Sequence, residues 1–258
     1  MPSAETFTID AFHRGRFHLS QPADKGHRAG VDAMLLAAAV PDGFDGTVAD
    51  LGAGAGAAGF AVASRCKDAK ILLVERSPEM TDCARCSIAL SENEPYAGRI
   101  NVLQADVEAT GRQRVAAGLP DNHFDFVIMN PPFNGPRDRA SPDSLRRDAH
   151  VMTEGLLERW IRSAAAIAAA GGGFAIIARA ESLEEILTAC AGRFGGIEIC
   201  PIHPRPQLAA IRIVLRARKG ARGMLKLLPP LVLHGEEGRD FTDRANAVIN
   251  GEQSLFPI

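Results

Sequence analysis

The sequence predicts an α/β fold with a doubly wound, mostly parallel sheet, helices on both faces and a final antiparallel pair of strands. Strand-like and helix-like segments alternate from about residue 47 onward. The strand-like segments are continuous apolar runs, which are typical of strands buried on both faces. The last two such segments have no helix between them, so we expect them to pair antiparallel.

The elements before this alternation form an N-terminal extension. Phe12–Leu19 predicts a hairpin that turns at a glycine, and Val31–Val40 is almost wholly apolar. A helix that is apolar all round is typically buried. Asp32 falls in its first turn, where it either stabilises the helix dipole or faces a ligand.

The alternating part predicts a strand–helix series. We expect strands at Thr47–Leu51, Lys70–Glu75, Arg99–Ala105, Phe124–Met129, Phe174–Ala178, Ile197–Ile202 and Ala209–Arg216. We expect helices near Ala57–Cys66, Pro78–Leu90, Gln113–Ala117, from Thr153 to the Gly171–Gly173 triplet, and at Glu181–Ala191. The predicted organisation is an extension over 1–45, a central domain over 46–218, and a tail over 219–258 that belongs to the same globule.

The composition limits the binding partners and the cellular compartment that we expect. The formal net charge is −2, so any nucleic-acid contact must be a local basic patch. Five cysteines without framework spacing favour a reducing cytosol, and we predict a cytoplasmic protein. No signal peptide or membrane span is visible, no metal site is predicted, and the oligomeric state stays open.

The loop after the first strand of the alternating series predicts a nucleoside cofactor. It runs Gly52-Ala53-Gly54-Ala55-Gly56, and Asp50 comes two residues before it. The next residues complete a formal dinucleotide fingerprint. However, a carboxylate beside the loop would repel a pyrophosphate, whereas the sulfonium and ammonium of S-adenosylmethionine would welcome it. We therefore predict S-adenosylmethionine, bound by Asp50, Gly52, Gly54 and Gly56.

Carboxylates at the next two strand ends extend this cofactor site. Glu75 ends the second strand, where it can accept hydrogen bonds from ribose hydroxyls. Asp106 follows the third strand, where it can accept from the adenine amino group. Asp32, if it faces a ligand, is the remaining cofactor candidate.

The fourth strand ends in an unusual tip, Asn130-Pro131-Pro132-Phe133. Two prolines stiffen the chain and fix the direction of its carbonyls, and the Asn130 amide adds one acceptor and two donors. Such a tip can grip a planar amino group with an aromatic face alongside. We assign the catalytic roles to Asn130, Pro131 and Phe133, with Asn130 also facing the cofactor.

Together, the loop, Glu75, Asp106 and the tip resemble class I methyltransferases that act on planar amino nitrogens. The segment from Gln21-Pro22 to Ala38 is similar to the N-terminal segment of bacterial tRNA adenine-N6 methyltransferases that modify the adenine beside the valine tRNA anticodon. The resemblance implies a Rossmann-like methyltransferase that modifies the exocyclic amine of an adenine in RNA, with tRNA favoured. Phe133 stands where tyrosine is common in that family.

RNA binding would need local cations. We predict that the phosphate contacts come from Arg137, Arg139, Arg146, Arg147, Arg205, Arg218 and Lys219. The alternatives are a glutamine methyltransferase acting on a release factor, adenine methylation in ribosomal RNA or DNA, and a non-catalytic RNA-binding protein of the same fold. A nicotinamide oxidoreductase is disfavoured by Asp50.

Overall fold

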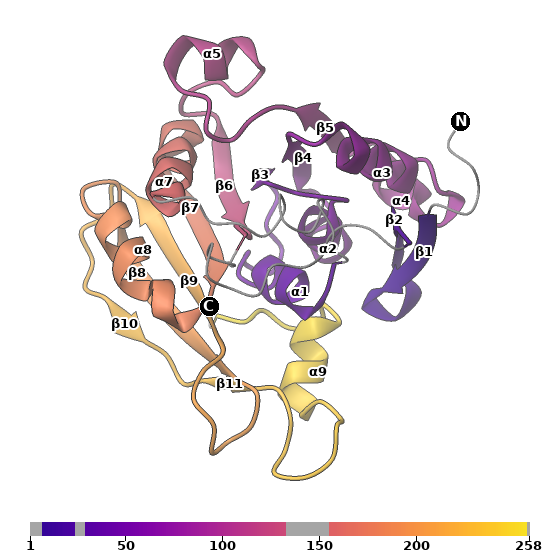
Figure 1. The fold of residues 1–258 in the computed structure, drawn as a ribbon, viewed down its shortest axis with the longest axis vertical. Helices are drawn as coiled ribbons and strands as arrows, with labels where there is room; N and C mark the ends of the chain where they lie inside the picture. The colour runs from indigo at the N-terminus through magenta and orange to yellow at the C-terminus, as the bar shows by residue number, and fades with distance from the viewer. Residues whose placement is uncertain (1–6, 24–28, 133–154, 257–258) are drawn as a thin grey trace, which may run out of the picture.

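The structure is a computed structural model that describes residues 7–23, 29–132 and 155–256. Within these residues the centre is a nine-stranded sheet (Figure 1) with the strand order β10-β8-β9-β7-β6-β3-β4-β5, in which β11 also pairs with β8. The strands of this sheet are β3 (Thr47–Leu51), β4 (Lys70–Glu75), β5 (Ile100–Gln104), β6 (Phe124–Met129), β7 (Ala168–Ala178), β8 (Phe194–His203), β9 (Arg212–Lys219), β10 (Lys226–Leu227) and β11 (Leu231–Val232).

The strand order places a topological switch point beside β3. From β3 the chain proceeds outward through β4 and β5, then crosses back to β6 on the other side of β3; all these pairs are parallel. Strand β9 lies between β7 and β8 and is antiparallel to both. The predicted fold class is therefore confirmed, and ligands of such sheets bind at the carboxyl ends of the strands near the switch point.

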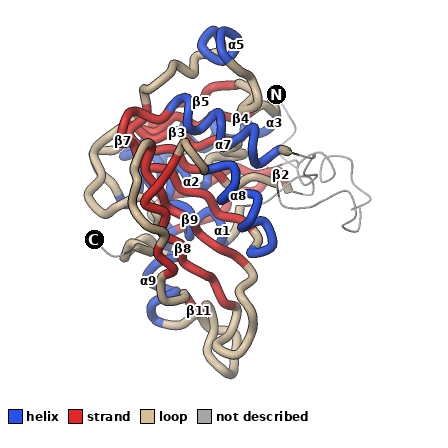
Figure 2. The backbone as a smooth tube through the Cα atoms, turned by 90° about the vertical axis from the view of Figure 1, so that its left-hand side faces the viewer, coloured by secondary structure: helices blue, strands red, loops and turns tan. Residues whose placement is uncertain are grey.

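Helices cover both faces of the sheet (Figure 2). One face is covered by α1 (Val31–Ala37), α2 (Ala57–Arg65) and α3 (Pro78–Ile88), and the other by α7 (Leu156–Ile167) and α8 (Leu183–Cys190). Side chains alternate between these layers, because Phe126 and Ile128 lie in the core of the first face and Val127 and Met129 in that of the second. A further helix, α5 (Gly111–Ala116), follows β5 and precedes β6 in the chain.

The N-terminal hairpin packs on the first helical layer. Its strands β1 (Phe7–Phe12) and β2 (Phe17–Pro22) pair antiparallel. The Phe17 ring stacks on Phe60 of α2 with centroids 5.8 Å apart, and the Ser20 N–H donates to the Ser87 hydroxyl of α3. The short helix α4 (Glu94–Ala97) follows α3 and contacts it.

The tail returns to the same layer. Strands β10 and β11 extend the sheet beside β8, and α9 (Asp243–Ile249) contacts α1. The Thr242 hydroxyl caps α9 by accepting from the Ala245 N–H. Leu255 and Phe256 are buried in the core that contains α1 and α2.

Several boundary predictions were wrong. Helix α7 ends at Ile167, and Gly171–Gly173 lies inside β7 instead of ending the helix. The reason is packing: the Phe126 ring lies over Gly173, where a Cβ would come within 2.3 Å of it. Strand β9 spans Arg212–Lys219, three residues later than the predicted start.

Candidate cofactor and substrate site

The strand register brings three of the predicted site residues to one level. Leu51 of β3 pairs with Val74 of β4 and with Met129 of β6. The next residue on each strand is Gly52, Glu75 or Asn130, so these three lie side by side at the carboxyl edge. Adjacent strands are about 4.8 Å apart, so the row spans about 10 Å. This is the scale of a nucleoside.

Asp50 holds the first turn of α2, the helix that follows the glycine loop. Its side chain is buried, and Oδ2 accepts a 2.9 Å hydrogen bond from the Gly59 N–H in the first turn of α2. Burial raises the pKa of Asp50 to about 7, although the Gly59 hydrogen bond opposes the shift; the charge of Glu75 raises it further. A cationic ligand beside Asp50 would favour its ionised form.

The glycine loop needs residues without side chains. Gly52 has φ +71° and Gly56 has φ +96°, a region that other residues rarely adopt. A Cβ on Gly52 would lie 2.5 Å from the indole of Trp160, and one on Gly56 would lie 2.6 Å from Leu73. The N–H groups of Gly52 and Ala53 both donate to the Val74 carbonyl, which fastens the loop to β4.

Glu75 links this loop to the start of α3. Its Oε2 accepts from the Gly54 N–H at 3.0 Å and its Oε1 accepts from the Ser77 N–H at 2.8 Å. Each carboxylate oxygen has a second acceptor site, so both can still accept from a ligand hydroxyl. The carboxylate is therefore held in one orientation beside the glycine loop.

Asp106 lies two residues beyond the end of β5. Its Oδ1 accepts from the Glu108 N–H at 2.8 Å, and its side chain is exposed. The turn it makes sets the direction of the segment 106–108, which borders the carboxyl edge on the β5 side.

The tip after β6 carries an unpartnered acceptor. The Oδ1 atom of Asn130 is buried and has no hydrogen-bond partner in the part of the chain that the structure describes. Pro131 is buried and Pro132 half-buried. Buried polar atoms are nearly always satisfied, so this acceptor at the carboxyl edge is available to a donor from a ligand. Phe133 lies outside the described residues.

Sequence reasoning missed the contribution of α7. Trp160 lies within the helix predicted from Thr153 onward and was given no role at the site. Its ring lies against Gly52, and its Nε1, like Asn130 Oδ1, is buried without a partner among the described residues. The Ser163 hydroxyl donates to the Val107 carbonyl at 2.6 Å, and Arg159 forms an ion pair with Glu108. Helical spacing alone could not separate Trp160 from the core residues around it.

Asp32 has a protein partner. Its Oδ2 accepts from Arg212 Nε at 2.9 Å, and both side chains are about a quarter exposed. Arg212 begins β9, so this ion pair ties α1 to the carboxyl edge of the sheet. Asp32 borders the site, and its predicted contact with the cofactor stays a prediction.

The three predicted RNA-binding residues that the structure describes do not lie together. Arg218 and Lys219 pair with the first two residues of β8, at the edge opposite Asn130. Arg205 is in the β8–β9 connection, and its guanidinium donates to the carbonyls of Gly235, Glu236 and Gly238. Lys219 Nζ donates to the Ala168 carbonyl at 2.7 Å. Arg137, Arg139, Arg146 and Arg147 lie outside the described residues.

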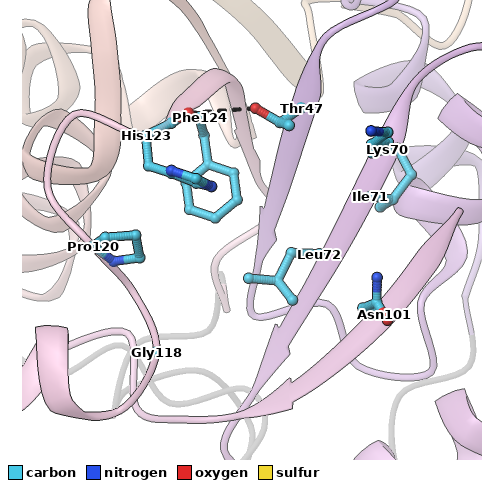
Figure 3. Close-up of a pocket in the computed structure, with 9 residues that line it drawn as sticks. All are labelled: Thr47, Lys70, Ile71, Leu72, Asn101, Gly118, Pro120, His123 and Phe124. Carbon is cyan, nitrogen blue, oxygen red and sulfur yellow. Dashed lines mark hydrogen bonds between the residues drawn. The ribbon is translucent and has the colours of Figure 1, made fainter.

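A shallow pocket also lies at that opposite edge (Figure 3). It is bordered by residues at or near the beginnings of β3, β4 and β6, among them Thr47, Lys70 and His123. None of the residues predicted to bind ligand lines it, and we assign it no role in the site.

These features agree with a family comparison. Residues 27–198 match the model of the methyltransferase small domain, which is about two thirds of the chain. The chain belongs to this family. S-adenosylmethionine is accordingly its cofactor, and the carboxyl-edge row of Gly52, Glu75 and Asn130 fits it.

Several proteins are similar to the chain. A crystal structure from Agrobacterium tumefaciens, described as a predicted O-methyltransferase, is 45% identical with a TM-score of 0.76; the match covers 87% of this chain and 98% of that one. The tRNA1(Val) (adenine(37)-N6)-methyltransferase of Porphyromonas gingivalis is 26% identical over 80% of this chain and 79% of its own length. The enzyme of the same name from Shewanella amazonensis is 35% identical, and the match spans 49% of this chain and 48% of that enzyme. A release factor glutamine methyltransferase from Mycolicibacterium smegmatis is 30% identical over 46% of this chain and 43% of its own.

In residues 7–23, 29–132 and 155–256, no helix is both long and apolar enough to cross a membrane. The same ranges contain no cluster of three or more side chains able to hold a metal ion.

Proposed function

We propose that this methyltransferase modifies the exocyclic N6 amine of an adenine in RNA, with an anticodon-loop adenine of a tRNA as the favoured acceptor. The observation that carries the proposal is the buried, unpartnered Oδ1 of Asn130, level with Gly52 of the cofactor loop. An amide oxygen there can accept an N–H that an incoming amino group supplies.

The chemistry explains why an acceptor is needed. The lone pair of an adenine amine is delocalised into the ring, which makes the nitrogen a poor nucleophile. If Asn130 Oδ1 and the Pro131 carbonyl each accept one N–H, electron density returns to the nitrogen and its lone pair is held in one direction. Phe133 is proposed to stack on the base and fix its plane.

S-adenosylmethionine supplies a methyl group on a positively charged sulfur, which already makes a good leaving group. The remaining task of the chain is positioning. Gly52, Gly54 and Glu75 would hold the cofactor, Asp50 would balance its positive charge, and Asp106 would accept from its adenine. The proton released from the amine passes to water, so no basic side chain is required.

The identity of the molecule that receives the methyl group is proposed from the relatives. Two of them are named as tRNA1(Val) adenine-N6 methyltransferases, one matched over most of its length. An unpaired loop base avoids the cost of flipping a base out of a duplex, and loop bases are recognised by stacking. Cations on this chain would then contact phosphates, and RNA binding should weaken with salt.

Two other acceptors have specific support. A glutamine side chain also carries a planar amide nitrogen, and one relative is named as a glutamine methyltransferase. A hydroxyl group is suggested by the description of the Agrobacterium protein. A hydroxyl offers a single hydrogen, so it would leave one of the two proposed acceptors at the tip unused.

Labelling decides among them. The protein would be incubated with S-adenosylmethionine labelled in the methyl group and, separately, with unmodified tRNA, ribosomal RNA, DNA and release factors. We expect label in tRNA, recovered as N6-methyladenosine after digestion. Label found only in protein, or only on ribose oxygen, would overturn the proposal.

A further inference from the structure

Trp160 is the single tryptophan of the chain and lies in α7. The six-membered ring of its indole faces Gly52, because a Cβ there would be 2.5 Å from Cη2 and 2.8 Å from Cζ3. Its Nε1 is buried, and no described residue accepts a hydrogen bond from it. An indole N–H is a donor only, so burying it without an acceptor is unfavourable.

The surroundings place the indole of Trp160 beside the cofactor loop. Three residues along the helix, on the same face, the Ser163 hydroxyl donates to the Val107 carbonyl at 2.6 Å. Arg159 is ion-paired with Glu108. These two contacts fasten α7 to the segment that follows Asp106. The helix that carries Trp160 therefore contacts both the Gly52 loop and the 106–108 segment, the two parts proposed to hold the nucleoside of the cofactor.

We propose that Trp160 is a cofactor-binding residue whose Nε1–H donates to an acceptor atom of the adenosine moiety. Two buried groups of the site would then be satisfied by ligands, Trp160 on the cofactor side and Asn130 on the substrate side. The inference rests on the cofactor position proposed above and is independent of which macromolecule receives the methyl group.

The first test uses the fluorescence of the protein, since all tryptophan emission comes from Trp160. S-adenosylhomocysteine, the product form that cannot react, would be titrated into the wild-type protein without any acceptor. We expect a saturable change in tryptophan emission whose midpoint matches the Kd from calorimetry. Saturation by calorimetry with unchanged emission would contradict the proposal.

The second test removes only the donor. Trp160→Phe keeps an aromatic ring and loses the N–H, and we expect the Kd for S-adenosylhomocysteine to rise about tenfold. Tyr96→Phe is the matched control, because it removes a hydroxyl that donates to the Arg16 carbonyl on the N-terminal hairpin. The control should bind with the wild-type Kd. An unchanged Kd in Trp160→Phe would overturn the proposal.

A third measurement identifies which part of the cofactor accepts the hydrogen bond from Trp160. Methylthioadenosine keeps the nucleoside and lacks the amino-acid part of the cofactor. We expect the Trp160→Phe variant to lose the same factor in affinity for it. A loss seen with S-adenosylhomocysteine alone would place the acceptor on the amino-acid part and refute the assignment to adenosine. None of these outcomes depends on methyl transfer, so a failure here can be told apart from a failure of the labelling experiment that identifies the methylated molecule.

Discussion

The substitution Asp50→Asn probes the most strongly perturbed carboxyl of the site. Burial raises the pKa of Asp50 from 3.8 to about 7. The folded state therefore binds a proton that the unfolded state releases between these values, and the stability contributed by Asp50 falls as pH rises through this window. Above pH 7 the ionised carboxylate costs the cofactor-free protein on the order of 4 kcal/mol.

Asparagine has nearly the same shape and can still accept from the Gly59 N–H. The variant should therefore gain stability relative to wild type as pH rises, by about 3 kcal/mol between pH 5 and pH 8. Urea unfolding of both proteins without cofactor at the two pH values measures this. Asp45→Asn, which changes an exposed carboxyl, is the control. A difference between Asp50→Asn and wild type that is the same at both pH values would refute the reasoning.

Asp50→Asn should also weaken the binding of the cofactor. A positively charged ligand favours the ionised carboxylate, so the wild-type affinity for S-adenosylmethionine should rise from pH 6 to pH 8. The variant should bind more weakly at pH 8 and show a flatter pH profile by calorimetry. Equal affinities at pH 8 would place the charged part of the cofactor away from Asp50.

Three further predictions follow from single contacts. Gly52→Ala should abolish measurable cofactor binding by calorimetry, because the new methyl meets Trp160 at a backbone φ of +71°; wild-type affinity would contradict the close packing. Arg205→Ala should lower the free energy of unfolding by about 1–3 kcal/mol, since its three backbone hydrogen bonds hold the 235–238 segment; unchanged stability would contradict this structural role. Replacing both Arg218 and Lys219 by alanine should leave kcat unchanged, because they lie at the opposite edge of the sheet; a rise in KM for tRNA alone would support their predicted phosphate contacts.

The parts of the fold that follow from local patterns were predictable. Strands β3, β4 and β6 end where the apolar runs end, so the level arrangement of Gly52, Glu75 and Asn130 could be expected from the sequence. A parallel sheet converts such strand ends into a shared edge.

The parts that depend on long-range packing were not predictable. Glycine triplets usually end helices, but Gly171–Gly173 continues β7 because the Phe126 ring needs the space. Arg218 and Lys219 end β9, and only the insertion of this strand between β7 and β8 shows that they lie at the edge opposite Asn130. Trp160 shares the spacing of core residues, and only its contact with Gly52 distinguishes it.

The role of Asn130 is tested most directly by mass spectrometry of methylated tRNA. Unmodified tRNA would be treated with wild type, Asn130→Ala and the control Asn101→Ala, whose exposed side chain lies on β5. We expect wild type and the control to form N6-methyladenosine, and Asn130→Ala to form at least a hundredfold less while still binding S-adenosylhomocysteine, in line with the loss of one preorganised group. Near-wild-type formation of N6-methyladenosine by Asn130→Ala would contradict the central role given to this residue.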